Sequence, residues 1–233
     1  MPKECEAILK KMESMHNPVN IAGMARFGIK AEKIHGITSA QIRQFAKETR
    51  RNHSLALELW ESKVYDARIL AGTIGEPKKM TESQMENWVK DFDSWAVCDH
   101  TCMFLFRKCA NAHEMAQKWA KRKEEFTRRT GFALIASLVV WDKGAEDEKF
   151  AKYFPLISKY STDERLYVKK AVNWALRQIG KRNLNLNKLA IRTARKIQKM
   201  DSKSARWIAG DALRELEGEA VQKRLKAKPL LIK

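Results

Sequence analysis

The sequence predicts an all-α fold. Apolar residues recur with helical periodicity from one end of the 233-residue chain to the other, and no segment alternates convincingly like a strand. Short polar or Gly/Pro segments interrupt this periodicity, which is typical of loops between helices. Such breaks occur at His35-Gly36, at Gly75-Glu76-Pro77 and at Lys143-Gly144.

Helix starts are marked in order along the chain by N-cap residues and capping boxes. They are Thr38 with Gln41, Thr81 before the helix that contains Trp88, and Ser161 with Glu164. The longest uncharged apolar stretch runs from Thr130 to Trp141, which is too short to cross a bilayer. This stretch therefore predicts a buried helix.

A weak internal repeat sets the architecture. Its pattern is a small or apolar residue, a basic residue, and alanines at helical spacing before a leucine. The two good copies begin at Val168 and Ala205, and the two poorer ones at Ala67 and Arg128. Because each copy begins the second helix of a pair, and copies recur at about 40 residues, the pattern is typical of HEAT-type repeats. We expect a superhelical solenoid with a concave binding face, one domain over residues 1–222 and a loosely ordered basic tail over 223–233.

The net positive charge of the chain indicates an anionic binding partner. Forty-six Lys and Arg against 28 Asp and Glu give a formal net charge of +18. Such a surface suits nucleic acid, an anionic membrane or an acidic protein, and the clustering of the charge favours nucleic acid. The N-terminus carries acidic residues and no apolar signal segment, so we expect a cytoplasmic protein without membrane attachment.

Trp95 and Asp99 form the first candidate site. At helical spacing their side chains share one face, and that face continues through Cys102, Phe106 and Cys109, which are apolar. A carboxylate on an apolar stripe needs either a partner or a function. Three of the four cysteines, Cys98, Cys102 and Cys109, lie on one predicted helix face, where they behave as small apolar residues, and the spacing of the cysteines predicts neither a disulfide nor a metal site.

Residues 162–181 form the second candidate site. One side of this predicted helix is apolar, and the opposite side alternates aromatic and basic residues, which interleaves stacking surfaces with phosphate contacts. The stripe consists of Tyr167, Lys170, Trp174, Arg177 and Lys181. The alternative is that neighbouring repeats cover it, since solenoid helices pack on two sides.

Arg129 has two readings of equal weight. It occupies the basic position of the repeat, equivalent to Arg68, Lys169 and Arg206, so it either pairs with a neighbouring repeat or contacts a ligand.

Common catalytic templates are missing from the sequence. It has no Gly-rich phosphate loop, zinc-binding HExxH helix or GxSxG elbow, and no histidine has a helical partner at metal-ligand spacing. We therefore expect no metal and no cofactor. His100 follows Asp99 directly, but adjacent helical residues diverge, so His100 is interpreted as structural.

Five segments of the chain resemble the AlkD family of bacterial DNA alkylation repair glycosylases, which are built from HEAT-like repeats. They are Met24-Ala25-Arg26-Phe27, Glu58-Leu59-Trp60, Trp95 through Asp99, Arg129, and Lys170 through Arg177. The resemblance extends from about Met24 to the repeat near Ala205. It implies a DNA glycosylase that hydrolyses the N-glycosidic bond of positively charged N3- or N7-alkylated purines in duplex DNA.

The resemblance also implies roles for particular residues. The catalytic aspartate of the family falls on Asp99, its sugar-contacting tryptophans on Trp95 and Trp174, and its arginines on Arg129 and Arg177. Phe27 departs from the family pattern, which has Tyr at the lesion-facing edge, and the lost hydroxyl bears on the substrate range rather than on the chemistry. Together with Tyr167, Lys170 and Lys181 from the stripe, the residues Arg129, Arg177 and Phe27 are our candidate DNA contacts.

The expected partner is double-stranded DNA that contains alkylated bases, bound by a monomer without a small-molecule cofactor. One alternative is a catalytically silent HEAT-repeat scaffold that binds DNA or structured RNA. Another is a protein-interaction solenoid whose basic groove takes an acidic partner. The second alternative leaves Trp95 and Asp99 unexplained.

Overall fold

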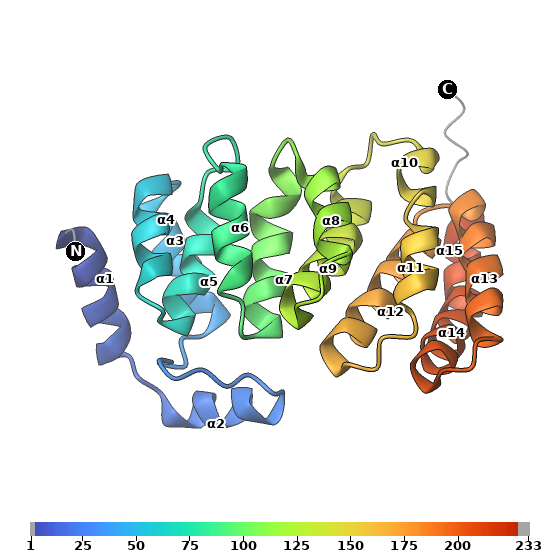
Figure 1. Ribbon diagram of the computed structural model, residues 1–233. Coiled ribbons are helices and arrows are strands. Elements are labelled where there is room, and N and C mark those ends of the chain that lie inside the picture. The colour runs from blue at the N-terminus through green and yellow to red at the C-terminus, as the bar shows by residue number, and fades with distance from the viewer. Residues whose placement is uncertain (1–2, 228–233) are drawn as a thin grey trace. The chain divides into compact units, whose positions relative to one another are not determined.

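The computed structural model describes residues 3–227, and all regular secondary structure in this range is helical (Figure 1). The predicted all-α fold is confirmed for this part of the chain. The chain divides into two compact units, residues 1–112 and residues 113–233. The single domain predicted over residues 1–222 stays a prediction. None of the helices in the described range is both long and apolar enough to cross a membrane.

The N-terminal unit is built around one central helix, α5, which packs against α3, α4 and α7. A second contact joins the outer helices α4 and α6, where Trp60 and Trp88 stack with ring centroids 4.0 Å apart. The helices of this unit are α1 (Lys3–Ser14), α2 (Pro18–Arg26), α3 (Ser39–Thr49), α4 (His53–Glu61), α5 (Tyr65–Ile74), α6 (Glu82–Lys90), α7 (Trp95–Phe104) and the 3₁₀ helix η1 (Phe106–Lys108).

The segment between α2 and α3 is held against α5 by a buried carboxylate. Asp66 is 1% exposed and accepts hydrogen bonds from the backbone N–H groups of His35 (2.6 Å) and Ile37 (2.9 Å). The backbone N–H of Tyr65 donates to the carbonyl of Lys33 at 2.8 Å. These contacts fix the start of α3 and restrain the chain that follows α2.

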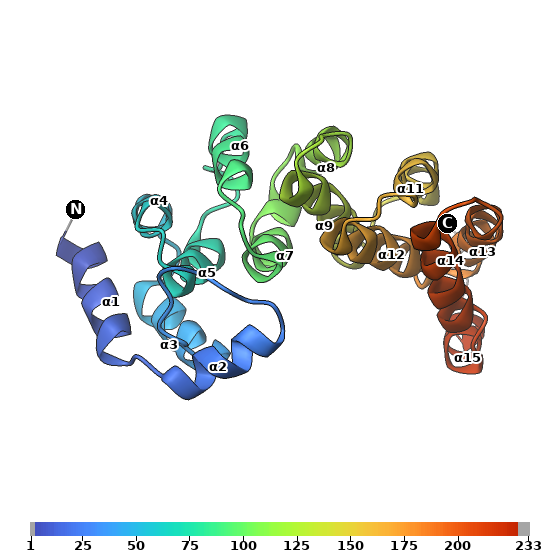
Figure 2. The same ribbon diagram turned by 60° about the horizontal axis from the view of Figure 1, so that its bottom comes forward.

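The C-terminal unit has two rows of helices (Figure 2). The inner row consists of α9, α12 and α14, in which α12 contacts both of the others, and α13 packs against α12 and α14 from the other row. The helices are α8 (Ala112–Ala120), α9 (Glu125–Trp141), α10 (Asp147–Ala151), α11 (Phe154–Tyr160), α12 (Leu166–Gly180), α13 (Leu184–Gln198), α14 (Lys203–Leu216) and α15 (Glu219–Ala227).

Gly131 sets the approach of α8 to α9. A Cβ atom at this position would collide with the backbone of Ala120 and lie 2.8 Å from the carbonyl oxygen of Ala116. Only glycine therefore permits this close packing. The buried helix predicted for Thr130–Trp141 is confirmed within α9, although Trp141 at its end is exposed.

Two of the three N-cap predictions are confirmed. Capping boxes form at Thr38 with Gln41 and at Thr81 with Gln84. The third is wrong: the hydroxyl of Ser161 donates to the carbonyl of Ser158, and α12 starts only after Arg165. The physical reason is that the carboxylate of Glu164 accepts instead from the hydroxyl of Ser202 and the backbone N–H of Ser204 at the start of α14.

The apolar stripe predicted to continue from Asp99 is also wrong in its second half. The helix α7 ends at Phe104, and Leu105 (φ −119°, ψ −67°) redirects the chain into η1. Phe106 and Cys109 are buried, but they do not share a helix with Asp99. All four cysteines are buried thiols, in keeping with their interpretation as small apolar residues.

The predicted tail begins too early. The helix α15 continues to Ala227, so residues 223–227 are helical. The rest of the predicted tail, residues 228–233, lies outside the described residues.

Candidate nucleic-acid interface

The first turns of α7 carry the N-terminal candidates. The hydroxyl of Ser94 accepts from the backbone N–H of Ala96 and caps the helix, which makes Trp95 its first residue. Asp99 follows one turn later, and both side chains are half-buried. The shared face predicted for the pair is therefore present at the start of α7.

Phe27 lies next to Trp95. The indole N–H of Trp95 donates to the backbone carbonyl of Phe27 at 3.0 Å, across 68 residues of sequence. Phe27 follows the last turn of α2, and its side chain is 75% exposed. Gly28 then turns the chain with φ of +76°, a conformation that favours glycine. The structure thus brings the backbone of Phe27, whose side chain is exposed, against the indole of Trp95.

His100 points away from this chemistry. Its Nε2 atom lies 2.8 Å from the hydroxyl of Thr73 on α5, and its ring stacks on Phe104. Burial lowers the pKa of His100 to about 4, so the ring is neutral at physiological pH. This geometry agrees with the structural role predicted for His100.

Arg129 is buried in the C-terminal unit, with 5% of its surface exposed. Its Nη1 atom donates to the backbone carbonyl of Tyr167 at 2.7 Å, and its guanidinium lies 6.0 Å from the centre of the Tyr167 ring. Arg68 in the N-terminal unit behaves in the same way, because it is buried and donates to the carbonyl of Asp91. Of the two readings left open for Arg129, the geometry favours contact with the neighbouring repeat.

The stripe on α12 is half covered. The apolar side is buried as predicted, Lys170 is exposed, and Tyr167 and Trp174 are half-buried. The cations at its C-terminal end already have partners on α14: Arg177 pairs with Glu215 (2.9 Å), and so does Lys181 (2.8 Å). The alternative in which a neighbouring repeat covers the stripe therefore applies to these two cations.

The acidic partners on α14 were missed by the sequence analysis. Asp211 lies 3.5 Å from Arg177 and accepts from the side-chain amide of Asn173 at 2.7 Å. Burial would raise the pKa of Glu215, but the ammonium of Lys181 and the guanidinium of Arg177 outweigh it and lower this pKa. The two carboxylates lie against the cations of the predicted anion-binding stripe and offset part of its positive charge.

A constant offset was the signal that could have revealed these partners. Three contacts join residues that are 38 positions apart: Arg129 to Tyr167, Asn173 to Asp211, and Arg177 to Glu215. This offset is the length of one helical repeat. A search for basic and acidic residues one repeat apart would have separated inter-repeat pairs from available cations.

Asp163, just before α12, anchors a second inter-repeat contact. It accepts from Arg128 of α9 at 2.6 Å and from Arg165 at 2.6 Å. Burial would raise its pKa, but the hydrogen bonds from the two arginines outweigh that effect and lower the pKa to about 2. This carboxylate is therefore a fixed negative charge in the folded protein.

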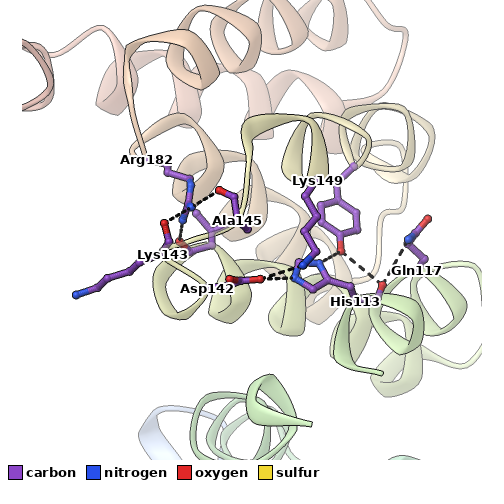
Figure 3. A network of polar contacts seen from close by, with 9 residues as sticks. His113, Gln117, Asp142, Lys143, Ala145, Lys149 and Arg182 are labelled. Atoms are coloured by element: carbon purple, nitrogen blue, oxygen red, sulfur yellow. Dashed lines mark hydrogen bonds and ion pairs between the residues drawn. The ribbon is translucent and has the colours of Figure 1, made fainter. Parts of the chain in front are cut away.

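A polar network around His113 was also missed (Figure 3). The Nδ1 atom of His113 lies 2.7 Å from the hydroxyl of Tyr153, and its Nε2 atom lies 3.1 Å from Asp142, which also pairs with Lys149. Burial lowers the pKa of His113, although the hydrogen bond to Asp142 opposes this. Tyr153 is fully buried and Lys149 is partly exposed, so the network joins helices from the core of the unit to its surface.

No group of three or more His, Cys, Asp or Glu side chains within residues 3–227 is arranged to hold a metal ion.

The candidate residues form two sets, one in each compact unit. The first is Phe27, Trp95 and Asp99; the second is Arg129, Tyr167, Lys170, Trp174, Arg177 and Lys181.

Comparisons with known proteins agree with this fold. A curated relative, the uncharacterized protein Lin0241 of Listeria innocua, is 23% identical over 130 residues, which are 54% of this chain and 58% of that protein. The aligned region therefore spans less than two thirds of the relative. A solved structure, described as a new family related to the HEAT-like repeat DNA glycosylases with affinity for branched DNA structures, matches with a TM-score of 0.78 at 21% identity, covering 94% of this chain and 95% of that chain.

The HEAT-like repeat fold predicted from the sequence is confirmed by this structural match. Residues 8–216 match the protein family described as DNA alkylation repair enzyme, and this range includes every candidate site residue. The chain belongs to the DNA alkylation repair enzyme family, as its resemblance to AlkD implied.

Proposed function

We propose that the protein is a DNA glycosylase that releases N3- or N7-alkylated purines from duplex DNA. Membership of the DNA alkylation repair family supports this proposal. The observation that carries it is the hydrogen bond from Trp95 to the carbonyl of Phe27, which joins an exposed aromatic ring to the helix that bears Asp99.

The chemistry needs one carboxylate. Alkylation at N3 or N7 makes the base cationic, so it leaves without protonation by a general acid. The deoxyribose then acquires oxocarbenium character, as in glycoside hydrolysis. Asp99 stabilises this positive charge and orients or deprotonates the attacking water.

Aromatic rings supply the surroundings of the sugar. Trp95, on the same helix as Asp99, provides a face for cation–π or CH–π contact and excludes bulk water, which would weaken the field of the carboxylate. Trp174 offers a further aromatic face on α12 of the C-terminal unit. Phe27 forms the edge that meets the lesion. In this scheme the base itself does not need to enter a closed pocket.

The basic candidate residues differ in how available their charges are for contact with DNA phosphates. Lys170 is exposed and free to meet the backbone of the DNA, whereas Arg177 and Lys181 first have to share their charge with Glu215. Arg129 acts through Tyr167, whose backbone carbonyl it holds. Register on the DNA is thereby fixed without reading the base sequence.

The direct test is base release by Asp99→Asn. The purified protein is incubated with duplex DNA that contains N7-methylguanine, and the free base is quantified. Losing an electrostatic group of this kind lowers the rate by about 10²–10³-fold, while DNA affinity is unchanged or higher because a negative charge is removed. The matched control is Asp93→Asn, an exposed carboxylate in the loop before α7, which should retain the wild-type rate.

A second candidate function is binding of DNA without catalysis. The pairing of Arg177 and Lys181 with Glu215 favours it, because a catalytic site that grips the phosphates near a lesion needs cations that a carboxylate does not neutralise. The similar solved structure is described as that of a protein family with affinity for branched DNA structures. Wild-type protein that binds DNA but releases no alkylated base would establish this function and exclude the glycosylase.

A further inference from the structure

The helix α13 carries a row of exposed cations that the proposed function does not use. Lys188, Arg192, Lys196 and Lys199 form no ion pair with any residue between 3 and 227, and Arg195 pairs with Glu217 at 2.8 Å. Together with Ile191, these five side chains line an open depression of about 490 Å³. We name this surface, defined by Lys188, Ile191, Arg192, Arg195, Lys196 and Lys199, the α13 surface.

The α13 surface is unlike the stripe on α12. On α12 the cations nearest α14 are neutralised by carboxylates, whereas on α13 five cations face a single paired carboxylate, Glu217. Asp147 lies near the start of the helix, where it accepts from the side chains of Asn183 and Asn185. Four of the five cations of the α13 surface are therefore without an ion pair among the described residues.

The spacing of these cations suits a nucleic-acid backbone. From Lys188 to Lys199 the helix rises about 16 Å, and a DNA strand places roughly five phosphates along that distance. Like charges three and four residues apart also destabilise a helix. The row costs the free protein stability, and a bound polyanion would remove that cost.

The α13 surface and the α12 stripe face opposite ways within the unit. The buried side of α13, which includes Ala190, Ala194 and Ile197, packs toward α12 and α14, so its cations point away from them. The stripe on α12 lies opposite the side that is buried in the core. A straight duplex cannot contact both, because two layers of helices, about 20 Å of protein, separate them.

We propose that the α13 surface binds the phosphate backbone of a second duplex segment, so that one protein molecule bridges two stretches of DNA. The proposal rests on the proposed DNA binding along the inner row. A membrane is a poor fit, because the only apolar residue on the surface is the half-buried Ile191. Regularly spaced arginines and lysines without aromatic anchors favour a phosphate backbone over a folded protein partner.

The test is capture of a second duplex. Wild-type protein is bound to an unmodified duplex on beads, and a fluorescent duplex is then added at several salt concentrations. A variant with Lys188, Arg192, Lys196 and Lys199 all changed to Gln is compared with wild type. The matched control changes Lys10, Arg43, Lys47 and Lys90 to Gln, four exposed cations without an ion pair among the described residues.

Wild type and control should capture the fluorescent duplex, and the α13 variant should not. Removing four phosphate contacts lowers the salt dependence of capture by about 3.6 in the logarithmic slope. The melting temperature of the α13 variant should equal or exceed that of wild type, because repulsion is relieved.

Equal capture by wild type and the α13 variant would overturn the proposal. So would binding of polyglutamate, but of no second duplex, by the α13 surface, since that result identifies an acidic protein partner. Asp99→Asn should still bridge duplexes while losing base release. Failure of the bridging proposal and failure of the glycosylase are therefore separate results.

Discussion

The two sets of candidate residues differ in how the chain uses them. Around α7 in the N-terminal unit, a hydrogen bond from Trp95 holds the segment that presents the exposed Phe27. Around α12 in the C-terminal unit, Arg129, Arg177 and Lys181 are engaged by neighbouring helices. The difference shows that a cation on a repeat helix serves packing first. We expect such a cation to contribute to DNA binding only where the next repeat supplies no partner.

The largest effect that would test this comparison is expected from Arg129→Met. A hydrogen bond from a charged donor to a buried carbonyl contributes about 1.5–3 kcal/mol, so the free energy of unfolding should fall by that amount. Urea denaturation measures it, with the exposed Arg43→Met as control. Unchanged stability combined with weaker DNA binding would make Arg129 a DNA contact and break the comparison.

A pH-dependent effect of similar size is expected at Asp163. Its folded pKa of about 2 is lower than the ordinary 3.8, so its stabilisation is full above pH 3.8 and is lost as the pH falls toward 2. Asp163→Asn should therefore lower the free energy of unfolding by up to about 2 kcal/mol at pH 7. The difference from wild type should shrink between pH 4 and pH 2 in urea titrations. Asp201→Asn, a fully exposed carboxylate, should show no such trend.

A smaller effect sharpens the comparison from the binding side. Glu215→Gln removes the charge that neutralises Arg177 and Lys181. Affinity for duplex DNA should rise, and the salt dependence should steepen by about 0.9 for each cation released, as measured by fluorescence anisotropy at several salt concentrations. Glu219→Gln is the control on the next helix. An unchanged slope would mean that these cations do not meet phosphate.

The smallest effect is expected from Trp95→Phe, which keeps an aromatic face but removes the donor to the carbonyl of Phe27. Losing this hydrogen bond costs about 0.5–1.5 kcal/mol locally. Hydrogen–deuterium exchange of residues 24–29 should become faster, and base release should fall a few-fold. Trp207→Phe, at an exposed position in the other unit, should leave both unchanged. Unaltered exchange would show that the hydrogen bond does not restrain α2.

The sequence predicted what depends on local patterns. Periodicity and the repeat predicted the helices α5, α9, α12 and α14, and the boxes at Thr38 and Thr81 predicted two helix starts. The box at Ser161 was wrong because Glu164 binds the start of α14 instead. A local motif cannot exclude a partner one repeat away.

In the candidate site, too, the local features were predictable from the sequence. The shared face of Trp95 and Asp99 follows from helical spacing, so it was within reach of the sequence. The end of α7 at Phe104 was not, because the turn at Leu105 carries no Gly or Pro signal. The neutralisation of Arg177 by Glu215 was missed for a different reason, because it becomes visible only when residues one repeat of 38 positions apart are compared.

The 38-residue offset also has a mechanical consequence. A pull on α14 reaches α12 through Asp211 and Glu215, and it passes from α12 to α9 through the carbonyl of Tyr167. Each link joins only adjacent inner helices, so the tension is carried in series. Under force the C-terminal unit should therefore unfold one helical pair at a time. The helices that precede an unfolded pair should remain packed.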